Sequence, residues 1–364
     1  MSTTHPQIPT HDFSGTPSQI GAAHGEAERK RIREYVDVFI GFILKNAAVN
    51  LTEEALWAKW SPQVAVNQRE APTLVEEMQG IARGAGVPFE RIFLLNSLLD
   101  LNCFRYLPMM DAFAGCTTYA VVREAGSGRT IIGQTYDMPE FHQNNVTLLR
   151  LKPAQGPRQL VMTFAGIVGC AGLNEAGLAV NINFLSARDC GPGRLHSVTV
   201  RQTLGCAQLA DALTMPVVPP RAGGAHYLIG DDAGNIVSIE TSGQRHDIMY
   251  PEGNAIGHTN HYLSAYCKEA EYIRRNSIGS SLARYTALRR FIREQGDKLT
   301  AQGLMDLSKN HTSYPRSICA HGADSDPKGF KNKTVSAMIQ VPAERKMHIT
   351  LGCACEGEYH EVKL

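Results

Sequence analysis

The feature that most constrains the fold is a change of sequence pattern near Gly115. Before it, apolar residues such as Val36, Phe39 and Ile43 recur at spacings of three and four, which is typical of helices that pack on one face. After it, segments rich in β-branched and aromatic residues alternate with short glycine-bearing turns such as Asn174–Gly177. Connections this short cannot join parallel strands, so the sequence predicts mainly antiparallel sheets.

The same patterns locate the individual elements. The predicted helices are residues 18–45, 52–60 with Thr52 as N-cap, 72–83, 89–99, 200–213 and 280–294. The predicted strands are residues 116–123, 130–136, 146–151, 159–165, 178–184, 225–230, 235–241, 334–341 and 346–351. Helices, then strands, then helices and two closing strands suggest an α+β fold of stacked sheets with helical outer layers.

Composition narrows the class of partner. The chain has 36 basic and 35 acidic side chains in 364 residues, and this balance disfavours non-specific binding to nucleic acid. Its longest apolar run, residues 38–44, is far shorter than the roughly 20 residues that cross a membrane. Nine cysteines without a framework spacing indicate reduced thiols, and the polar N-terminus predicts no signal peptide. We therefore expect a cytoplasmic protein whose partner is a small molecule.

The stretch Gly115-Cys116-Thr117-Thr118-Tyr119 offers a distinctive chemistry. If the chain were cut between Gly115 and Cys116, the cysteine would carry both a thiol and a free α-amino group. An α-amine has an ordinary pKa of about 7.7–8.0, so it can accept a proton near neutral pH. One residue would then supply nucleophile and base, with no histidine partner. Glycine suits the position before the cut because it lets the thiol approach its carbonyl.

Four blocks of the sequence resemble one enzyme family. They are Ala114–Tyr119 (AGCTTY), Gly133–Asp137 (GQTYD), Gly172–Asn181 (GLNEAGLAVN) and His258–Leu263 (HTNHYL). In order and spacing they are similar to the self-processing N-terminal-nucleophile (Ntn) enzymes related to fungal isopenicillin N acyltransferase. The resemblance implies an αββα sandwich of two stacked, mainly antiparallel sheets, autocatalytic cutting before the cysteine, and hydrolysis or acyl transfer at an amide.

The resemblance also assigns roles to residues of this sequence. Cys116 takes the position of the nucleophile, and the bond from Gly115 to Cys116 that of the processing site. Asp137 ends the second block, and a hairpin between the two strands can bring its carboxylate near the new amine. Asn260 resembles the family's oxyanion donor, a type of group worth about 2.7–4 kcal/mol in better-studied acyl-transfer sites.

Two further residues, Tyr119 and Arg316, are candidate substrate contacts. A backbone N–H near Thr117 or Tyr119 is the expected second oxyanion donor. The segment Pro315–Ala320 (PRSICA) departs from the family, because relatives often follow Ser-Ile-Cys with arginine where this chain has Ala320. Either the role of that arginine is in doubt here, or Arg316, on the other side of the block, has taken it over.

A metal site is a weaker interpretation of the C-terminal cysteines. Cys353 and Cys355 lie near His348 and His360 in the sequence. A C-x-C spacing is too tight for the usual zinc knuckle, and no second cysteine pair follows it. The sequence therefore predicts no metal and no cofactor.

Together these patterns predict a cysteine Ntn amidohydrolase that cleaves an N-acyl amino acid, a β-alanyl amine or a small peptide through a thioester. The alternatives are an acyl-CoA-dependent N-acyltransferase, an unprocessed non-catalytic binding protein, and a conventional cysteine hydrolase with His258 or His261 as base. We expect residues 1–115 to be the helical segment released by the cut and residues 116–364 the catalytic segment. Both fragments are expected to remain associated in one αββα domain, and a homo-oligomer is compatible with this arrangement.

Overall fold

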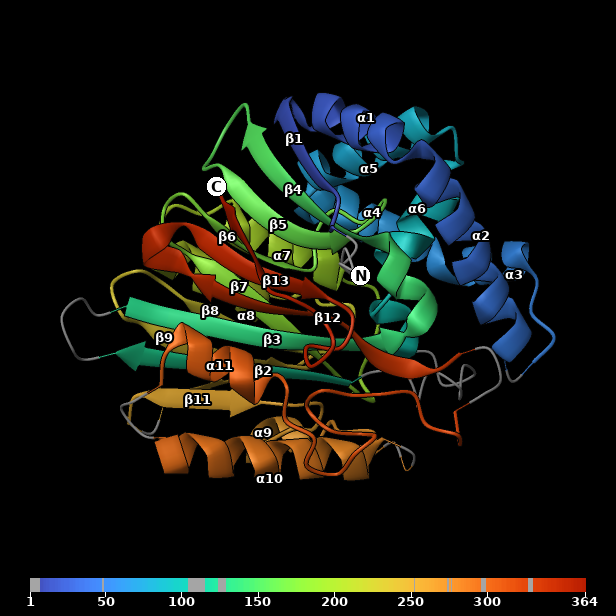
Figure 1. Cartoon of the computed structure of the whole chain (residues 1–364). Helices are drawn as coiled ribbons and strands as arrows, with labels where there is room; N and C mark the ends of the chain where they lie inside the picture. The colour runs from blue at the N-terminus through green and yellow to red at the C-terminus, as the bar shows by residue number, and fades with distance from the viewer. Residues whose placement is uncertain are drawn as a thin grey trace, which may run out of the picture.

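The computed structural model describes residues 7–47, 49–103, 115–123, 129–251, 253–273, 275, 277–295, 299–326 and 330–364 (Figure 1). Its α-helices are α1 (Pro17–Ala27), α2 (Arg29–Asn46), α3 (Glu53–Trp60), α4 (Pro62–Glu70), α5 (Pro72–Ala85), α6 (Phe89–Asn96), α7 (His196–Leu204), α8 (Leu209–Val217), α9 (Ala265–Lys268), α10 (Ile278–Gln295) and α11 (Ala301–Leu307). No helix among these residues is long and apolar enough to cross a membrane.

The strands form two sheets. Their bounds are β1 (Thr10–Gly15), β2 (Gly115–Arg123), β3 (Arg129–Pro139), β4 (Val146–Pro153), β5 (Gln159–Phe164), β6 (Ala171–Asn174), β7 (Ala179–Leu185), β8 (Gly224–Gly230), β9 (Ile236–Thr241), β10 (His246–Met249), β11 (Ala255–His258), β12 (Asn332–Val341), β13 (Lys346–Leu351) and β14 (His360–Lys363). One sheet has the order β1-β4-β5-β6-β7-β8-β9-β10, and the other β11-β2-β3-β12-β13-β14. Only the β1–β4 pair among these described strands is parallel, so the expectation of mainly antiparallel sheets is confirmed.

The two sheets are stacked between helical layers (Figure 1). The inner faces meet through contacts of β2 and β3 with β7, and of β2 with β8 and β9. Helices α7 and α8 pack on the outside of the eight-stranded sheet, beside the N-terminal helices. Helices α10 and α11 pack on the outside of the six-stranded sheet. This is the predicted αββα sandwich.

Local signals explain where some of the helices begin and end. The Thr52 hydroxyl accepts a hydrogen bond from the N–H of Ala55, as expected of the N-cap of α3. Gly86 ends α5 in the left-handed conformation, with φ of 64°. The predicted single helix over residues 18–45 is wrong, because the chain breaks into α1 and α2 at Glu28. The buried Glu28 carboxylate accepts a hydrogen bond of 2.6 Å from the Arg31 guanidinium and lies 2.8 Å from Nε2 of His11.

Helices α1 and α5 approach each other unusually closely because glycines line their contact. A Cβ on Gly21 would lie 2.0 Å from the carbonyl oxygen of Glu77, and one on Gly25 would lie 2.3 Å from that of Ile81. No real side chain fits at such distances. The glycines therefore fix how the N-terminal helices stack against the rest of the molecule.

One apolar core spans both sides of the predicted cut. Phe39 and Phe93, from the N-terminal helices, are buried in the same cluster as Leu149 and Phe164 from the eight-stranded sheet. Residues before 115 and after 116 thus share a continuous interior. The boundary at Gly115 and the release of residues 1–115 stay predictions.

Candidate active site

Strand β2 lies between β11 and β3 and brings three of the four sequence blocks to one place. Its first residues pair with the end of β3, so that Gly115 is opposite Asp137. On its other side, Thr118 pairs with His258, the last residue of β11. Continuing that antiparallel register by two residues places Asn260 opposite Cys116. The hairpin geometry expected for Cys116 and Asp137 is therefore present, and Asn260 joins them from the opposite neighbour.

The Cys116 nucleophile candidate is almost completely buried, with 3% of its surface exposed. Its backbone N–H donates a hydrogen bond of 2.8 Å to Oδ1 of Asn260. Burial, with a smaller effect of the nearby Asp137 charge, raises the pKa of the Cys116 thiol to about 12. In the intact chain this sulfur is a protonated thiol, and it needs a base before it can attack.

The Asp137 carboxyl group lies at the end of β3, opposite Gly115. One oxygen accepts a hydrogen bond of 2.7 Å from the Thr334 hydroxyl. The other, Oδ2, is buried without a hydrogen-bond partner among the described residues and lies 2.9 Å from where a Cβ on Gly115 would be. Burial raises the pKa of Asp137 to about 7, although the Arg284 charge acts in the opposite direction. A carboxyl group with this pKa exchanges its proton near neutral pH.

Arg284 is a site residue that the sequence reasoning missed. Its buried guanidinium, carried by α10, donates to the Cys116 carbonyl oxygen at 2.6 Å and to the Thr117 hydroxyl at 3.0 Å. A third bond, of 2.8 Å, goes to Oδ1 of Asn260. Its position in the sequence could have indicated this, because Arg284 is three residues from Ser281 and therefore shares the buried face of the helix. An arginine on a buried face needs partners there.

The contacts of Asn260 fix which way its amide points. Oδ1 receives two N–H donors, from Cys116 and Arg284, and Nδ2 donates to the carbonyl oxygen of Phe184 at 3.0 Å. If the amide were turned over, its NH₂ group would face the N–H groups of Cys116 and Arg284, which are also donors. In this structure the amide oxygen thus holds the nucleophile's backbone nitrogen, whereas the expected oxyanion role calls on Nδ2 and stays a prediction.

The two candidate substrate contacts lie elsewhere. Tyr119 is three residues from Cys116 along β2, so its side chain is on the opposite face and packs over Gly133, among the residues under α10 and α11. The structure does not bring it to the thiol. Arg316 lines a small hollow with Gly115 and Asp137, but its guanidinium forms an ion pair of 2.6 Å with Asp326.

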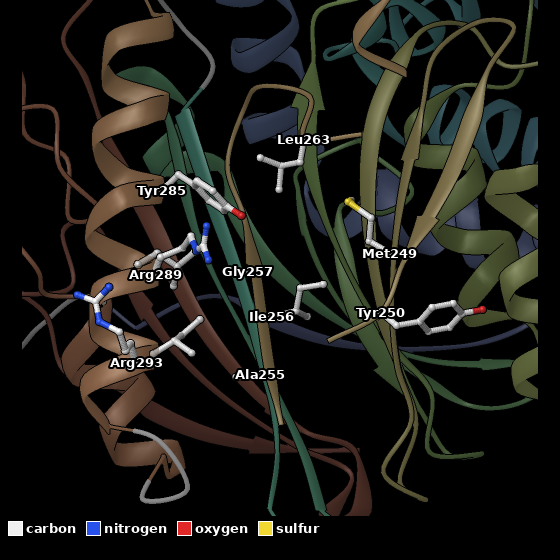
Figure 2. Close-up of a pocket in the computed structure, with 11 residues that line it drawn as sticks. Met249, Tyr250, Ala255, Ile256, Gly257, Leu263, Tyr285, Arg289 and Arg293 are labelled. Atoms are coloured by element: carbon white, nitrogen blue, oxygen red, sulfur yellow. The ribbon is translucent and has the colours of Figure 1, made fainter. Parts of the chain in front are cut away.

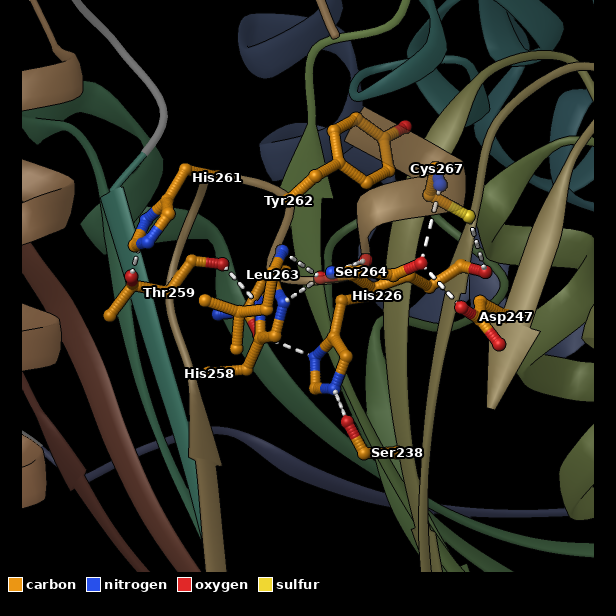
Figure 3. A network of polar contacts seen from close by, with 12 residues as sticks. His226, Ser238, Asp247, His258, Thr259, His261, Tyr262, Leu263, Ser264 and Cys267 are labelled. Atoms are coloured by element: carbon orange, nitrogen blue, oxygen red, sulfur yellow. Dashed lines mark hydrogen bonds and ion pairs between the residues drawn. The ribbon is translucent and has the colours of Figure 1, made fainter. Parts of the chain in front are cut away.

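The two histidines that flank Asn260 support the backbone (Figure 3). His258 is fully buried, stacks on His226 with ring centroids 3.8 Å apart, and contacts the Glu240 carboxylate at 2.7 Å. His261 contacts the Ser281 hydroxyl at 2.8 Å, and burial lowers its pKa to about 4. Neither ring forms a hydrogen bond with the Cys116 sulfur in the part of the chain that the structure describes, which weighs against a conventional cysteine–histidine pair.

A pocket of about 450 Å³ lies between α10 and the β11 edge of the six-stranded sheet (Figure 2). Ile256, Leu263 and Leu288 give it apolar walls. Arg289 points into it from α10, over the ring of Tyr285. The same helix therefore carries Arg284 to Cys116 and, five residues later, a cation to this pocket.

The residues that line this pocket do not include Cys116, Asp137 or Asn260. Its floor includes Gly257, which pairs with Tyr119. That residue is three positions from Cys116, or about 10 Å along an extended strand.

Comparison with known proteins identifies the family. The model of the family described as acyl-coenzyme A:6-aminopenicillanic acid acyl-transferase matches residues 123–354. The chain is 26% identical over 340 residues to the 40 kDa form of acyl-coenzyme A:6-aminopenicillanic-acid-acyltransferase of Emericella nidulans, covering 93% of this chain and 91% of that protein.

Among solved structures, a Caenorhabditis elegans N-acylethanolamine-hydrolyzing acid amidase ortholog is similar at a TM-score of 0.45 and 14% identity, over 63% of this chain and 93% of that one. Penicillin V acylase from Agrobacterium tumefaciens is similar at a TM-score of 0.46 and 12% identity, and the match covers 68% of this chain and 86% of that one. The family match covers well over half of the sequence. The chain belongs to the acyl-coenzyme A:6-aminopenicillanic acid acyl-transferase family and is an enzyme of the amide hydrolase and acyltransferase type.

Proposed function

We propose that this chain is a precursor that cuts itself between Gly115 and Cys116 and then hydrolyses amides with Cys116 as an N-terminal nucleophile. The observation that carries the proposal is the hydrogen bond from the Cys116 backbone nitrogen to Asn260, beside the free oxygen of Asp137. In the intact strand the Asn260 amide oxygen satisfies this backbone N–H, and after a cut it would hold the same nitrogen in place as an amine. This arrangement suits a nitrogen that becomes a catalytic amine.

The first reaction is the cut itself. Asp137 accepts the thiol proton, and the Cys116 sulfur attacks the carbonyl carbon of Gly115. The C–N bond to Cys116 breaks, its nitrogen takes up a proton to become the α-amine, and water hydrolyses the thioester to a Gly115 carboxylate and a free thiol. With pKa values of about 12 for the thiol and about 7 for the acid, the initial proton transfer costs roughly 7 kcal/mol, which adds to the barrier of the cut.

In the mature enzyme the α-amine replaces Asp137 as the base. It takes the thiol proton as the sulfur attacks the substrate carbonyl, and it returns this proton to the leaving amine. Arg284 and Asn260 hold the Cys116 backbone so that amine and thiol keep their relative position. A thioester acyl-enzyme forms, and water then releases the acid.

The pocket beside α10 suggests the class of substrate. Arg289 forms no ion pair among the described residues, and it faces apolar walls. Such a site suits an amide that carries an apolar part and an anionic end, as an N-acyl amino acid does. We therefore place N-acyl amino acids before β-alanyl amines, which lack the anion.

Acyl-CoA-dependent transfer is the second candidate function. The family's name and the same Arg289, which suits phosphate as well as carboxylate, favour it. The two functions differ in what attacks the thioester, since a transferase must hold an amine and exclude water.

The decisive experiment is the denatured mass of purified protein, with N-terminal sequencing of each fragment. Self-processing yields fragments of 115 and 249 residues, roughly 13 and 27 kDa, the larger beginning Cys-Thr-Thr. Cys116→Ala abolishes the cut, whereas Cys206→Ser, at a thiol that contacts the Gln202 carbonyl at the end of α7, leaves it intact. An intact wild-type chain that hydrolyses amides would instead support a conventional cysteine hydrolase, and an intact chain without activity would support a binding protein.

A further inference from the structure

A cluster of cysteines and histidines lies outside the residues that build the Cys116 site. His311, Cys319 and His321 belong to the segment between α11 and β12, and Cys355 to the turn after β13. Their four ligand atoms lie within 4.8 Å of one another. The segments meet because the carbonyl of Ala320 accepts from the Cys353 thiol, which stands two residues before Cys355.

Four of the six distances within the cluster match the edges of a tetrahedron around a metal ion, and the other two, from His311 to each sulfur, are at most 4.8 Å. Zinc bound at about 2.3 Å from sulfur and about 2.05 Å from nitrogen requires edges of about 3.8 Å between sulfurs, 3.6 Å between sulfur and nitrogen, and 3.3 Å between nitrogens. The Cys319 and Cys355 sulfurs are 3.6 Å apart. They lie 3.7 and 3.4 Å from Nε2 of His321, which is 3.2 Å from Nε2 of His311.

We propose that His311, Cys319, His321 and Cys355 bind one divalent metal ion of the zinc type. Two thiolates and two imidazoles in a tetrahedron are the donor set and geometry that zinc prefers. Binding forms two metal–sulfur and two metal–nitrogen bonds, and both thiol protons pass to solvent. The four protein ligands close the coordination sphere, which makes this a structural site.

The surroundings of His321 fit a metal ligand. With Nε2 turned toward the cluster, its other ring nitrogen lies 3.5 Å from the Glu356 carboxylate. A carboxylate behind a ligating histidine fixes the ring and strengthens the nitrogen donor. His311 and Cys355 are exposed, so the ion can enter from solvent.

The ion would join the PRSICA segment to the end of β13 next to the active site. Ala320, the residue after Cys319, donates its N–H to the Thr334 hydroxyl at 2.8 Å. That hydroxyl in turn donates to Asp137. A bound metal would therefore help to fix Thr334, the hydrogen-bond donor to Asp137, which is the proposed base of the cut.

The proposed site does not use the two histidines that the sequence places nearest to the C-terminal cysteines. His348 and His360 lie in the paired strands β13 and β14. The two cysteines of the C-x-C motif also lie apart, because the Cys355 sulfur belongs to the cluster around Nε2 of His321 and the Cys353 sulfur lies 3.7 Å from Nδ1 of the same ring.

The test is the metal content of the full-length protein purified under reducing conditions, followed by titration of chelator-treated protein with Co²⁺. We expect about one zinc per chain, and visible and sulfur-to-cobalt charge-transfer bands that saturate at one equivalent. Cys355→Ser and His311→Ala should each lower the affinity at least tenfold. Cys190→Ser and His348→Ala are the matched controls and should change neither.

Wild-type protein alone also decides the matter, should the variants fail to fold. Bound metal protects Cys355 from alkylation, and a chelator removes this protection. Reduced protein that shows no cobalt–thiolate bands overturns the proposal, as does Cys355→Ser with unchanged affinity. A Cys319–Cys355 disulfide that yields no metal binding after reduction overturns it too. None of these readouts depends on self-cutting or amide turnover.

Discussion

Replacing Asp137 by asparagine should make the protein more stable in mild alkali and slow the proposed self-cut. The carboxyl group is buried, with one hydrogen bond from Thr334 and an unpartnered Oδ2. Its pKa rises from 3.8 to about 7 on folding, so the folded state keeps a proton that the unfolded chain loses. Stability is therefore lost as the pH rises from about 4 through 7. The shift corresponds to roughly 4 kcal/mol, of which about 2.5 kcal/mol falls between pH 5 and 8.

The comparison is made in a Cys116→Ala background, which keeps both chains whole. Urea unfolding at pH 5 and pH 8 gives the free energy of unfolding with and without Asp137→Asn. Asparagine does not titrate, so the gap between the two proteins should widen by about 2.5 kcal/mol toward pH 8. In the chain that retains Cys116, Asp137→Asn should slow the cut by 10²–10⁴-fold, about what a general base contributes.

The reasoning fails if the two proteins show the same change in unfolding free energy between pH 5 and 8, because Asp137 would then be ionised normally. It also fails if Asp137→Asn is cut at the wild-type rate. In wild-type protein the rate of cutting should rise with pH through about 7, since only the ionised carboxylate accepts the thiol proton.

Three further predictions follow from the same geometry. Gly115→Ala places a Cβ 2.9 Å from the Asp137 carboxylate, so the chain should fold but be cut at least tenfold more slowly on a gel time course. Arg284→Met leaves buried acceptors without donors and should lower the free energy of unfolding by about 3 kcal/mol; a change under 1 kcal/mol would contradict its assigned contacts. Arg289→Ala should raise KM for an N-acyl amino acid about tenfold and leave KM for an uncharged acyl amide unchanged, whereas Arg290→Ala, at an exposed pair with Glu294, should affect neither.

The fold could be predicted where local pattern and tertiary context agree. Strand β2 and its hairpin with β3 have strong β propensity and a short connection, so the pairing of Cys116 with the end of β3 followed from the sequence. Strand β1, by contrast, is polar and alternates between half-buried and exposed residues, and only its parallel pairing with β4 defines it. The break at Glu28 likewise depends on a remote partner, His11.

The candidate site likewise contains residues that local pattern could predict and one that it could not. Cys116 and Asp137 lie on neighbouring strands, whereas Arg284 reaches them from a helix 168 residues later in the chain than Cys116. Its inward direction depends on which face of α10 packs, and the apolar pattern suggested a face that includes Leu282, which is 48% exposed. Distances between remote segments are not encoded in local spacing.

The core shared by the two sides of Gly115 has a consequence for how the protein withstands heat. Strand β1 hydrogen-bonds to β4, and Phe39 and Phe93 are buried with side chains of the eight-stranded sheet. Once a peptide bond between these halves is broken, every one of those contacts becomes intermolecular. The precursor would melt as one molecule, whereas the cut protein would melt as a heterodimer. Its melting temperature would fall on dilution, and its halves, once separated, would have to find each other again.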